Sequence, residues 1–143
     1  MKSMTFQINF KIDGPPRAKG RPRFANRGKF VSTYTDSKTR AYEDHVRECA
    51  KKAMGSSLPL GTALDAFIYV SFGVPASYSK KRKEACLNGS EKHIKKPDLD
   101  NVVKAVLDGC EKVIFWSDAQ IVYTHSTKKY GHPHVEVLFR ESE

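Results

Sequence analysis

The sequence predicts a single domain, residues 1–143, of the α/β (α+β) class, in which helices pack on a mixed β-sheet. Three observations favour this class. The chain is long enough for one hydrophobic core and too short for two. Several segments alternate apolar and polar residues as half-buried strands do, and two long segments repeat apolar residues at helical spacing. The expected order of elements is roughly β-α-β-α-α-β-β.

Each expected element has a local signal in the chain. The first strand alternates Phe6, Ile8, Phe10 and Ile12 with polar residues. The segment Gly14–Phe30 that follows is rich in glycine and proline, which predicts a loop. Strands are expected over Thr5–Asp13, Ala63–Pro75, Ala119–Tyr130 and Pro133–Glu141, and helices over Asp36–Met54, Ser77–Ser90 and Asp98–Val113.

Two further expectations concern packing. The last two strands are joined by a short connection that contains Gly131, so we expect them to pair as a hairpin. The long helix that begins near Asp98 carries one apolar stripe, which can face the core or a partner subunit, and we expect the core. The stripe consists of Val102, Val103, Val106, Leu107, Cys110 and Val113.

The composition is strongly basic. The 25 Lys and Arg residues against 16 Asp and Glu give a net charge of +9, which suits a polyanionic partner, although a soluble protein without one can also be basic. Cys49, Cys86 and Cys110 form no CxxC pair, which predicts reduced thiols in a cytoplasmic protein. No segment is typical of a signal peptide or a membrane span, so no membrane partner is expected.

The segment KPDLDNVVKAVLDG, residues 96–109, opens a helix with two carboxylates, Asp98 and Asp100. Lys104 follows Asp100 at i+4, on the same helical face, where the two side chains can meet. A third carboxylate, Asp118, comes after the helix in IFWSDAQI. Because such a helix spans about 24 Å, Asp118 reaches Asp100 only if the helix ends early and the chain folds back, or if the site closes across a dimer.

These residues admit two interpretations. Aspartates at a helix start cap free N–H groups and suit the positive end of the helix dipole, and Asp118 can simply be solvated. Alternatively, the carboxylates bind a hard divalent cation such as Mg²⁺, which prefers oxygen ligands. With Lys104 to neutralise phosphate charge, such a site suits phosphodiester hydrolysis.

Two basic stretches flank the carboxylates. The first holds no acid and mixes cations with glycine, proline and aromatic residues, so it can follow a phosphate backbone. The second leads directly into the aspartates. Each alone can be a solvated face, but together they favour nucleic acid delivered to a metal. The cations are Arg17, Lys19, Arg21, Arg23, Arg27 and Lys29 in the first stretch, and Lys80, Lys81, Arg82, Lys83, Lys92, Lys95 and Lys96 in the second.

Other chemistries lack their signatures in this chain. His132 and His134 have no third Cys or His near them, so a turn and a strand are expected there rather than a metal site. No G-x-S-x-G nucleophile motif is present, and GPPRAKGRPR does not keep the spacing of a nucleotide-binding P-loop. No organic cofactor is therefore expected.

Three motifs together resemble the RusA family of Holliday junction resolvases, small endonucleases often carried by prophages. The motifs are GPPRAKGRPRF near the N-terminus, KPDLDNVVKAVLDG in the middle and WSDAQI after it. The resemblance runs from about Gly14 to the last strand, and its specific part is the D-L-D-N-x-x-K-x-x-x-D element.

The resemblance implies a homodimer of mixed α/β fold that binds four-way DNA junctions in recombination and repair. It implies symmetric nicks in two strands with Mg²⁺, for which Mn²⁺ can substitute. It also implies Asp98, Asp100 and Asp118 as the catalytic, metal-binding carboxylates and Lys104 as the essential basic residue. The residues expected to bind DNA are Arg17, Lys19, Arg21, Arg23, Lys95 and Lys96.

Four further positions belong to the motifs. Asn101, Asp108 and Gln120 fall within them, and whether they contribute directly is left open. The family often has a second acidic residue beside the last aspartate, where this chain has Ser117. The register of Asp118 in the site is therefore open by one position.

Two alternative functions stay open at the level of sequence. One is a non-catalytic protein that binds branched DNA, which the loss of a carboxylate would mark, and none of the three is missing. The other is a nuclease of flap or other branched DNA. Phosphate contacts carry no information about branching, so they do not separate this function from junction cleavage.

Overall fold

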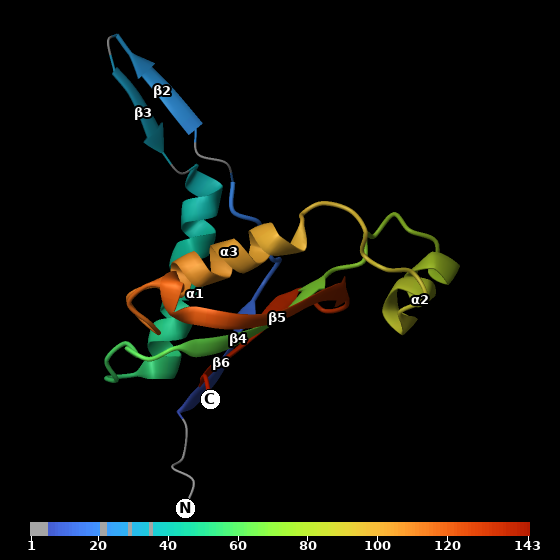
Figure 1. Cartoon of the computed structure of the whole chain (residues 1–143). Coiled ribbons are helices and arrows are strands. Elements are labelled where there is room, and N and C mark those ends of the chain that lie inside the picture. Colours follow the sequence, from blue (N-terminus) through green and yellow to red (C-terminus); the bar gives the residue numbers. More distant parts are fainter. Residues whose placement is uncertain (1–5, 21–22, 29, 35) are drawn as a thin grey trace, which may run out of the picture.

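The computed structural model describes residues 6–20, 23–28, 30–34 and 36–143, with residues 23–27 and 30–34 described by their backbone alone. Helices pack on a mixed sheet, and the predicted β-α-β-α-α-β-β series is confirmed (Figure 1). The elements are β1 (Gln7–Asp13), β2 (Arg23–Arg27), β3 (Phe30–Tyr34), α1 (Ser37–Met54), β4 (Leu64–Phe72), α2 (Lys80–Asn88), α3 (Leu99–Cys110), the 3₁₀ turn η1 (Asp118–Gln120), β5 (Ile121–Tyr130) and β6 (His134–Glu141).

The main sheet has the strand order β1-β6-β4-β5. Strand β6 is antiparallel to both β1 and β4, whereas β4 and β5 are parallel. Strand β4 lies inside the sheet because it is the most apolar strand, and only Phe67 and Tyr69 along it are not fully buried. Parallel and antiparallel neighbours on the two sides of one strand are what makes the sheet mixed.

The predicted hairpin between the last two strands is wrong. Strands β5 and β6 do not pair with each other, because β4 lies between them and bonds to both. Two strand spacings are about 9.6 Å, a gap that an extended connection of three residues can span. The connection bonds to the end of β4, where the Gly131 N–H donates to the Phe72 carbonyl at 2.8 Å.

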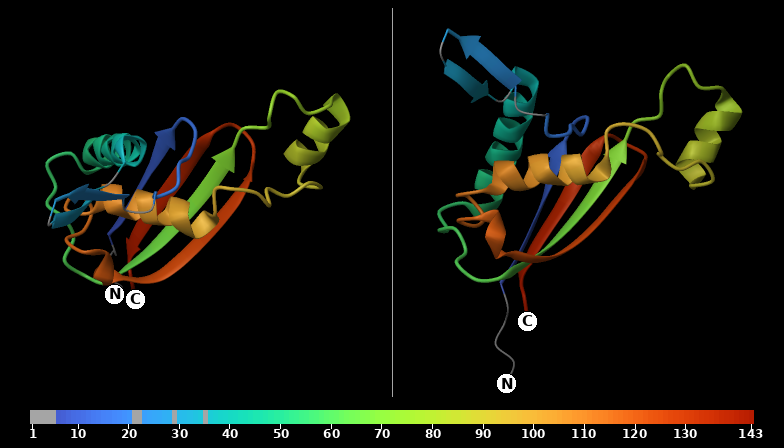
Figure 2. Two further views of the ribbon diagram at one scale, coloured as in Figure 1. Left: turned by 90° about the horizontal axis from the view of Figure 1, so that it is seen from above. Right: turned by 45° about the horizontal axis from the view of Figure 1, so that its top comes forward.

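The core lies between the main sheet and helices α1 and α3, which cover the same face (Figure 2). The stripe predicted on α3 faces this core, since Val102, Val106, Leu107 and Cys110 are buried and Val103 packs against them. The expectation of a core role is therefore confirmed for the stripe.

The helix ends follow their capping signals. Asp36 caps α1 by accepting a hydrogen bond from the Thr39 N–H at 2.9 Å, and Gly89 ends α2 in the left-handed region, with φ of 87°. Helix α3 ends at Cys110, three residues before the predicted end at Val113, because the chain turns sharply through Lys112, whose φ is 67°.

The loop predicted over Gly14–Phe30 is wrong in its second half. After an irregular first half, β2 and β3 form a separate antiparallel hairpin in which Arg27 pairs with Phe30. Gly28 begins the turn with φ of 65°, a conformation that a residue with a Cβ adopts only with strain. The hairpin projects from the N-terminal end of α1 (Figures 1 and 2).

A second projection lies on the far side of the molecule. The α2 lobe, which we define as residues 74–97, extends beyond the end of the sheet opposite the hairpin (Figures 1 and 2). Its last residues lead into α3, whose N-terminal end is directed toward the lobe. The start of α3 therefore lies between two projecting basic segments.

No helix in the described part of the chain is long and apolar enough to cross a membrane. Cys49, Cys86 and Cys110 are all free thiols, as predicted.

Candidate active site

The first turn of α3 presents two carboxylates to solvent. Asp98 occupies the N-cap position, yet its side chain makes no capping hydrogen bond. Its carboxylate is 49% exposed and lies 3.0 Å from the ammonium of Lys96. Asp100 is also exposed and accepts a hydrogen bond from the Asn101 N–H at 3.0 Å. Simple capping therefore does not account for Asp98.

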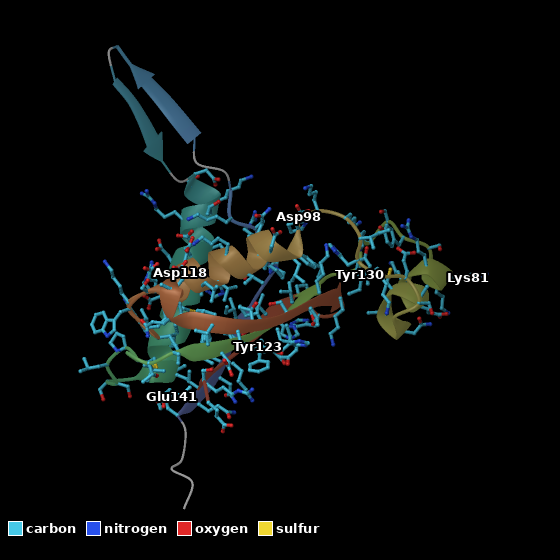
Figure 3. All side chains as sticks on the ribbon, in the orientation of Figure 1. Lys81, Asp98, Asp118, Tyr123, Tyr130 and Glu141 are labelled. Atoms are coloured by element: carbon cyan, nitrogen blue, oxygen red, sulfur yellow. The ribbon has the colours of Figure 1, made fainter. Side chains whose placement is uncertain are left out.

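Asp118 returns to the side of α3 because the helix ends early. Residues 111–117 reverse the chain, and Asp118 begins η1 with its carboxylate 2.9 Å from the Lys104 ammonium. Figure 3 shows Asp98 at the N-terminal end of α3 and Asp118 near the other end. The chain thus folds back within one subunit, and Lys104 lies between the two carboxylate groups along the helix.

Gln120 fixes the loop that carries Asp118. Its Oε1 accepts from the N–H groups of Trp116 and Ser117 at 2.9 and 3.0 Å. Its Nε2 donates to the carbonyls of Leu60 and Thr62, both at 2.9 Å. Because the oxygen and the nitrogen of its amide are both hydrogen-bonded, Gln120 fixes the loop that carries Asp118 to the segment that contains Leu60 and Thr62.

Lys104 belongs to an extended ion-pair network. Besides Asp118, it pairs with Asp108 at 3.1 Å, and Asp108 in turn pairs with Lys19 at 3.1 Å. Lys19 also bonds to Glu43 on α1. The hydrogen bond to Asp118, followed by that to Asp108, raises the pKa of Lys104, so its side chain is a cation at neutral pH. Within the described residues, no ion pair joins Lys104 to Asp100.

The three carboxylates predicted to share a metal are not gathered into one group. Among the residues that the structure describes, no three Asp, Glu, His or Cys side chains lie close enough together to hold a metal ion. Asp98 and Asp100 nevertheless offer exposed hard oxygen donors, and one or two carboxylates with water and phosphate oxygens suffice for Mg²⁺. Asp118 is bound to Lys104 instead.

The backbone just before Asp98 is held by a lysine of the sheet. The Lys128 ammonium donates to the carbonyls of Lys95 and Pro97 at 2.9 and 3.2 Å. The bond between Lys96 and Pro97 is cis. These contacts place the end of the α2 lobe against β5 and so set the position at which α3 begins.

A hollow of about 390 Å³ lies beside this point. Two exposed cations, Arg17 and Lys38, stand at it, and Lys38 was not anticipated from sequence because it lies alone in the first turn of α1. The hollow is lined by Pro16, Arg17, Gly20, Lys38, Thr39 and Pro97, among others. Asp36 lines the hollow as well, and Arg17 and Lys38 are the groups there that suit a phosphate.

The residues predicted to bind DNA occupy different environments. Arg17 is exposed, whereas the Lys95 ammonium bonds to the Tyr78 hydroxyl at 2.8 Å and Lys96 pairs with Asp98. Arg21 lies outside the described residues, and Arg23 is in β2, where only the backbone is described. The ammonium of Lys19 faces two carboxylates rather than solvent.

The two histidines of GHPHVE adopt the expected turn and strand. His134 lies at the start of β6 and its Nδ1 is 2.6 Å from the His132 carbonyl. Its other ring nitrogen lies 3.3 Å from Glu136. Both ring nitrogens therefore already have protein partners.

The sequence of this chain matches a known protein family over most of its length. A family model described as "Endodeoxyribonuclease RusA" matches residues 13–140. The chain belongs to the RusA family. Membership confirms the resemblance drawn from the three motifs and indicates endodeoxyribonuclease activity. This RusA-family chain is also 33% identical over 136 residues to the "Uncharacterized protein YqaN" of Bacillus subtilis (strain 168), across 94% of this chain and 96% of the relative.

Proposed function

We propose that the protein is a Mg²⁺-dependent endodeoxyribonuclease that resolves four-way Holliday junctions by paired symmetric nicks, in DNA recombination and repair. The observation that carries the proposal is the start of α3. Asp98 is placed as a helix cap but does not cap, and it stands exposed beside Asp100. Membership of the RusA family supports the reaction class.

The metal is the first part of the proposal. Asp98 and Asp100 would hold Mg²⁺, or Mn²⁺ in its place, and Asp118 would complete the site from the other side of Lys104. When bound, the metal supplies screening of the phosphate charge, an activated water and stabilisation of the leaving oxygen. The exposure of both α3 carboxylates and their hard oxygen donors fit such an ion.

Lys104 has a separate role in this proposal. Its raised pKa keeps the ammonium charged at the pH at which the reaction runs. A fixed cation beside a phosphate stabilises the negative charge that grows on it in the transition state, and it does so without reorganisation when it is already held in place. Asp108 and Asp118 hold Lys104 in this structure.

DNA would approach between the two projecting basic segments. Arg17, Arg21 and Arg23 of the first basic stretch and Lys95 and Lys96 of the second would contact phosphates, since cations supply most of the affinity for a DNA backbone. The start of α3 lies between these segments (Figure 1), so a bound backbone passes its carboxylates.

A homodimer completes the proposal, because paired nicks in two strands need two active sites related by a twofold axis. Strand β5 supports it, since it lies at the edge of the sheet and exposes Val122 and Tyr123, at 61% and 50%. An exposed apolar edge strand is a liability for a monomer and is usually covered. Trp116 is 55% exposed nearby in the chain.

The test is a cleavage assay on a synthetic four-way junction beside a matched linear duplex and a flap, with Mg²⁺ and with EDTA. We expect nicks in two opposed strands of the junction, only with the metal, and little cutting of linear DNA. Binding of the junction without cutting would instead favour a non-catalytic branched-DNA-binding protein. Preference for the flap would favour a nuclease of other branched DNA.

A further inference from the structure

The ammonium of Lys19 is held between two carboxylates from different helices. It bonds to Glu43 of α1 and pairs with Asp108 of α3 at 3.1 Å. The three side chains are only 25%, 15% and 16% exposed, respectively. Burial alone lowers the pKa of Lys19, but the bonds to Glu43 and Asp108 outweigh it and raise the pKa. Lys19 is therefore a fixed cation whose charge is largely offset by its partners.

Asp108 uses its two oxygens in two directions. Its Oδ2 faces Lys19 and its Oδ1 faces Lys104, each at 3.1 Å. Lys104 then reaches Asp118 at 2.9 Å. Charges alternate along this series from α1 to η1, so each member is attracted to both neighbours. An isolated exposed ion pair contributes little, whereas a network that is partly shielded fixes its members more firmly.

The backbone around the network is fixed as well. The Lys19 N–H donates to the Asn101 carbonyl at 2.9 Å, and Arg47 of α1 donates to the Asp108 carbonyl at 3.2 Å. At Gly109 the two helices approach so closely that a Cβ would lie 2.7 Å from Val46. Glu43 is thus placed by the packing of α1 on α3, and Lys19 by its backbone hydrogen bond to α3, both independently of Lys104.

We propose that Glu43 and Lys19 are positioning residues, which hold Asp108 so that Asp108 keeps the Lys104 ammonium against Asp118. The inference rests on the proposed function, because it assigns their purpose to the cleavage step. Lys104 is 50% exposed and its side chain is long, so without a fixed Asp108 its ammonium samples other directions. Lys19 is only 25% exposed and its two partners are more buried still, so its ammonium faces them rather than DNA. This burial separates Lys19 from Lys104, which is 50% exposed.

The test variant is Glu43→Gln, which removes one charge at the far end of the series and leaves Lys104 and its direct partners intact. We expect single-turnover cleavage of the junction to fall about tenfold, as for partners that orient active-site ligands. The dissociation constant for the junction in EDTA should stay within about twofold of wild type, because Glu43 is shielded from DNA. The matched control is Glu48→Gln on the same helix, since Lys51 is the one ion-pair partner of Glu48 among the described residues, at 3.5 Å.

A double-mutant cycle distinguishes positioning from a general structural effect. In an Asp108→Asn background the series is already interrupted, so adding Glu43→Gln should cost no further cleavage. An equal loss of cleavage in both backgrounds would overturn the proposal. So would a weakened affinity with an unchanged cleavage rate, which would instead mark a DNA-contacting segment.

A readout that needs no cleavage keeps the inference separate from the proposed function. The order of the Lys104 side chain, followed by NMR relaxation at its Cε at neutral pH, should decrease in Glu43→Gln and stay unchanged in Glu48→Gln. Unchanged order in Glu43→Gln overturns the positioning role, whether or not the protein cuts DNA. Decreased order in a protein that cuts no junction supports the positioning and overturns the proposed function.

Discussion

His93 is a buried base that anchors the α2 lobe to the sheet. Its ring is 6% exposed and stacks on Phe72 with ring centroids 4.2 Å apart, while Tyr130 packs against it at 5.0 Å. The Nδ1 atom is buried and has no hydrogen-bond partner among the residues that the structure describes. Burial, with the nearby cations Lys128 and Lys95, lowers the pKa of His93 below its usual value of 6.5. The packing therefore requires the neutral ring.

This environment predicts a loss of stability in mild acid. Below pH 6.5 the unfolded chain takes up a proton at His93 while the folded chain resists it, so the free energy of unfolding falls as the pH falls through that value. Each unit of lowered pKa is worth about 1.4 kcal/mol. Between pH 7.5 and 5, the temperature of thermal unfolding should depend less on pH in His93→Phe than in the wild-type protein. His132→Gln, at an exposed residue of the connection between β5 and β6, is the control, and an equal effect of the two changes would contradict the assignment.

The i+4 spacing in the sequence allows Lys104 to meet Asp100, but it does not identify the partners that Lys104 has. In the structure Lys104 pairs with Asp108 and Asp118. A lysine on a helix can reach residues four positions before it and four positions after it. Which of them it pairs with depends here on Asp118, which the chain brings back to α3 after the helix ends. The partner of Lys19 is Glu43, which is 24 residues away, and no local pattern reports such a contact. Metal binding by Asp98, Asp100 and Asp118 stays a prediction.

Among the elements, long periodic segments were predictable and their pairing was not. Helices α1 and α3 and strands β1, β4, β5 and β6 follow their hydrophobic patterns. A short connection between β5 and β6 suggested a hairpin, but β4 occupies the place between them because it is the most apolar strand. Which strand lies in the middle of a sheet depends on all the strands together. The sequence of β5 and β6 alone therefore does not show that β4 separates them.

The β2–β3 hairpin was missed for a different reason. Glycine and proline between Gly14 and Gly28 indicated a loop, and they do mark its first half. Beyond that, Gly28 serves as the turn of a hairpin rather than as part of a longer irregular segment. Each strand of this hairpin has only five residues, which is too short a run for hydrophobic alternation to identify a strand with certainty.

For the whole molecule, the two projecting basic segments on either side of α3 predict the direction from which DNA arrives.

The exposed edge of β5 predicts a partner subunit. Sedimentation at micromolar concentration should show a species of twice 16.1 kDa. Val122→Lys should shift it toward the monomer, because a lysine on an edge strand opposes pairing with another strand. Only a 16.1 kDa species for the wild-type protein would contradict the homodimer.

If the carboxylates of α3 act in DNA cleavage and not in DNA binding, Asp100→Asn should separate the two. The carboxamide keeps the shape of the side chain but loses its charge, so it is a poor ligand for Mg²⁺. Removing a negative charge from a surface that faces DNA should leave binding unchanged or tighter. The control is Asp44→Asn on α1, since in the described part of the chain Asp44 pairs with Arg47 alone, at 3.4 Å.

The measurement is single-turnover nicking of a four-way junction with Mg²⁺, alongside the dissociation constant for the same junction in EDTA. We predict that Asp100→Asn loses several orders of magnitude in the nicking rate and none of the affinity, while Asp44→Asn behaves as wild type. Nicking by Asp100→Asn at the wild-type rate, or a loss confined to affinity, would show that Asp100 does not act in the cleavage step.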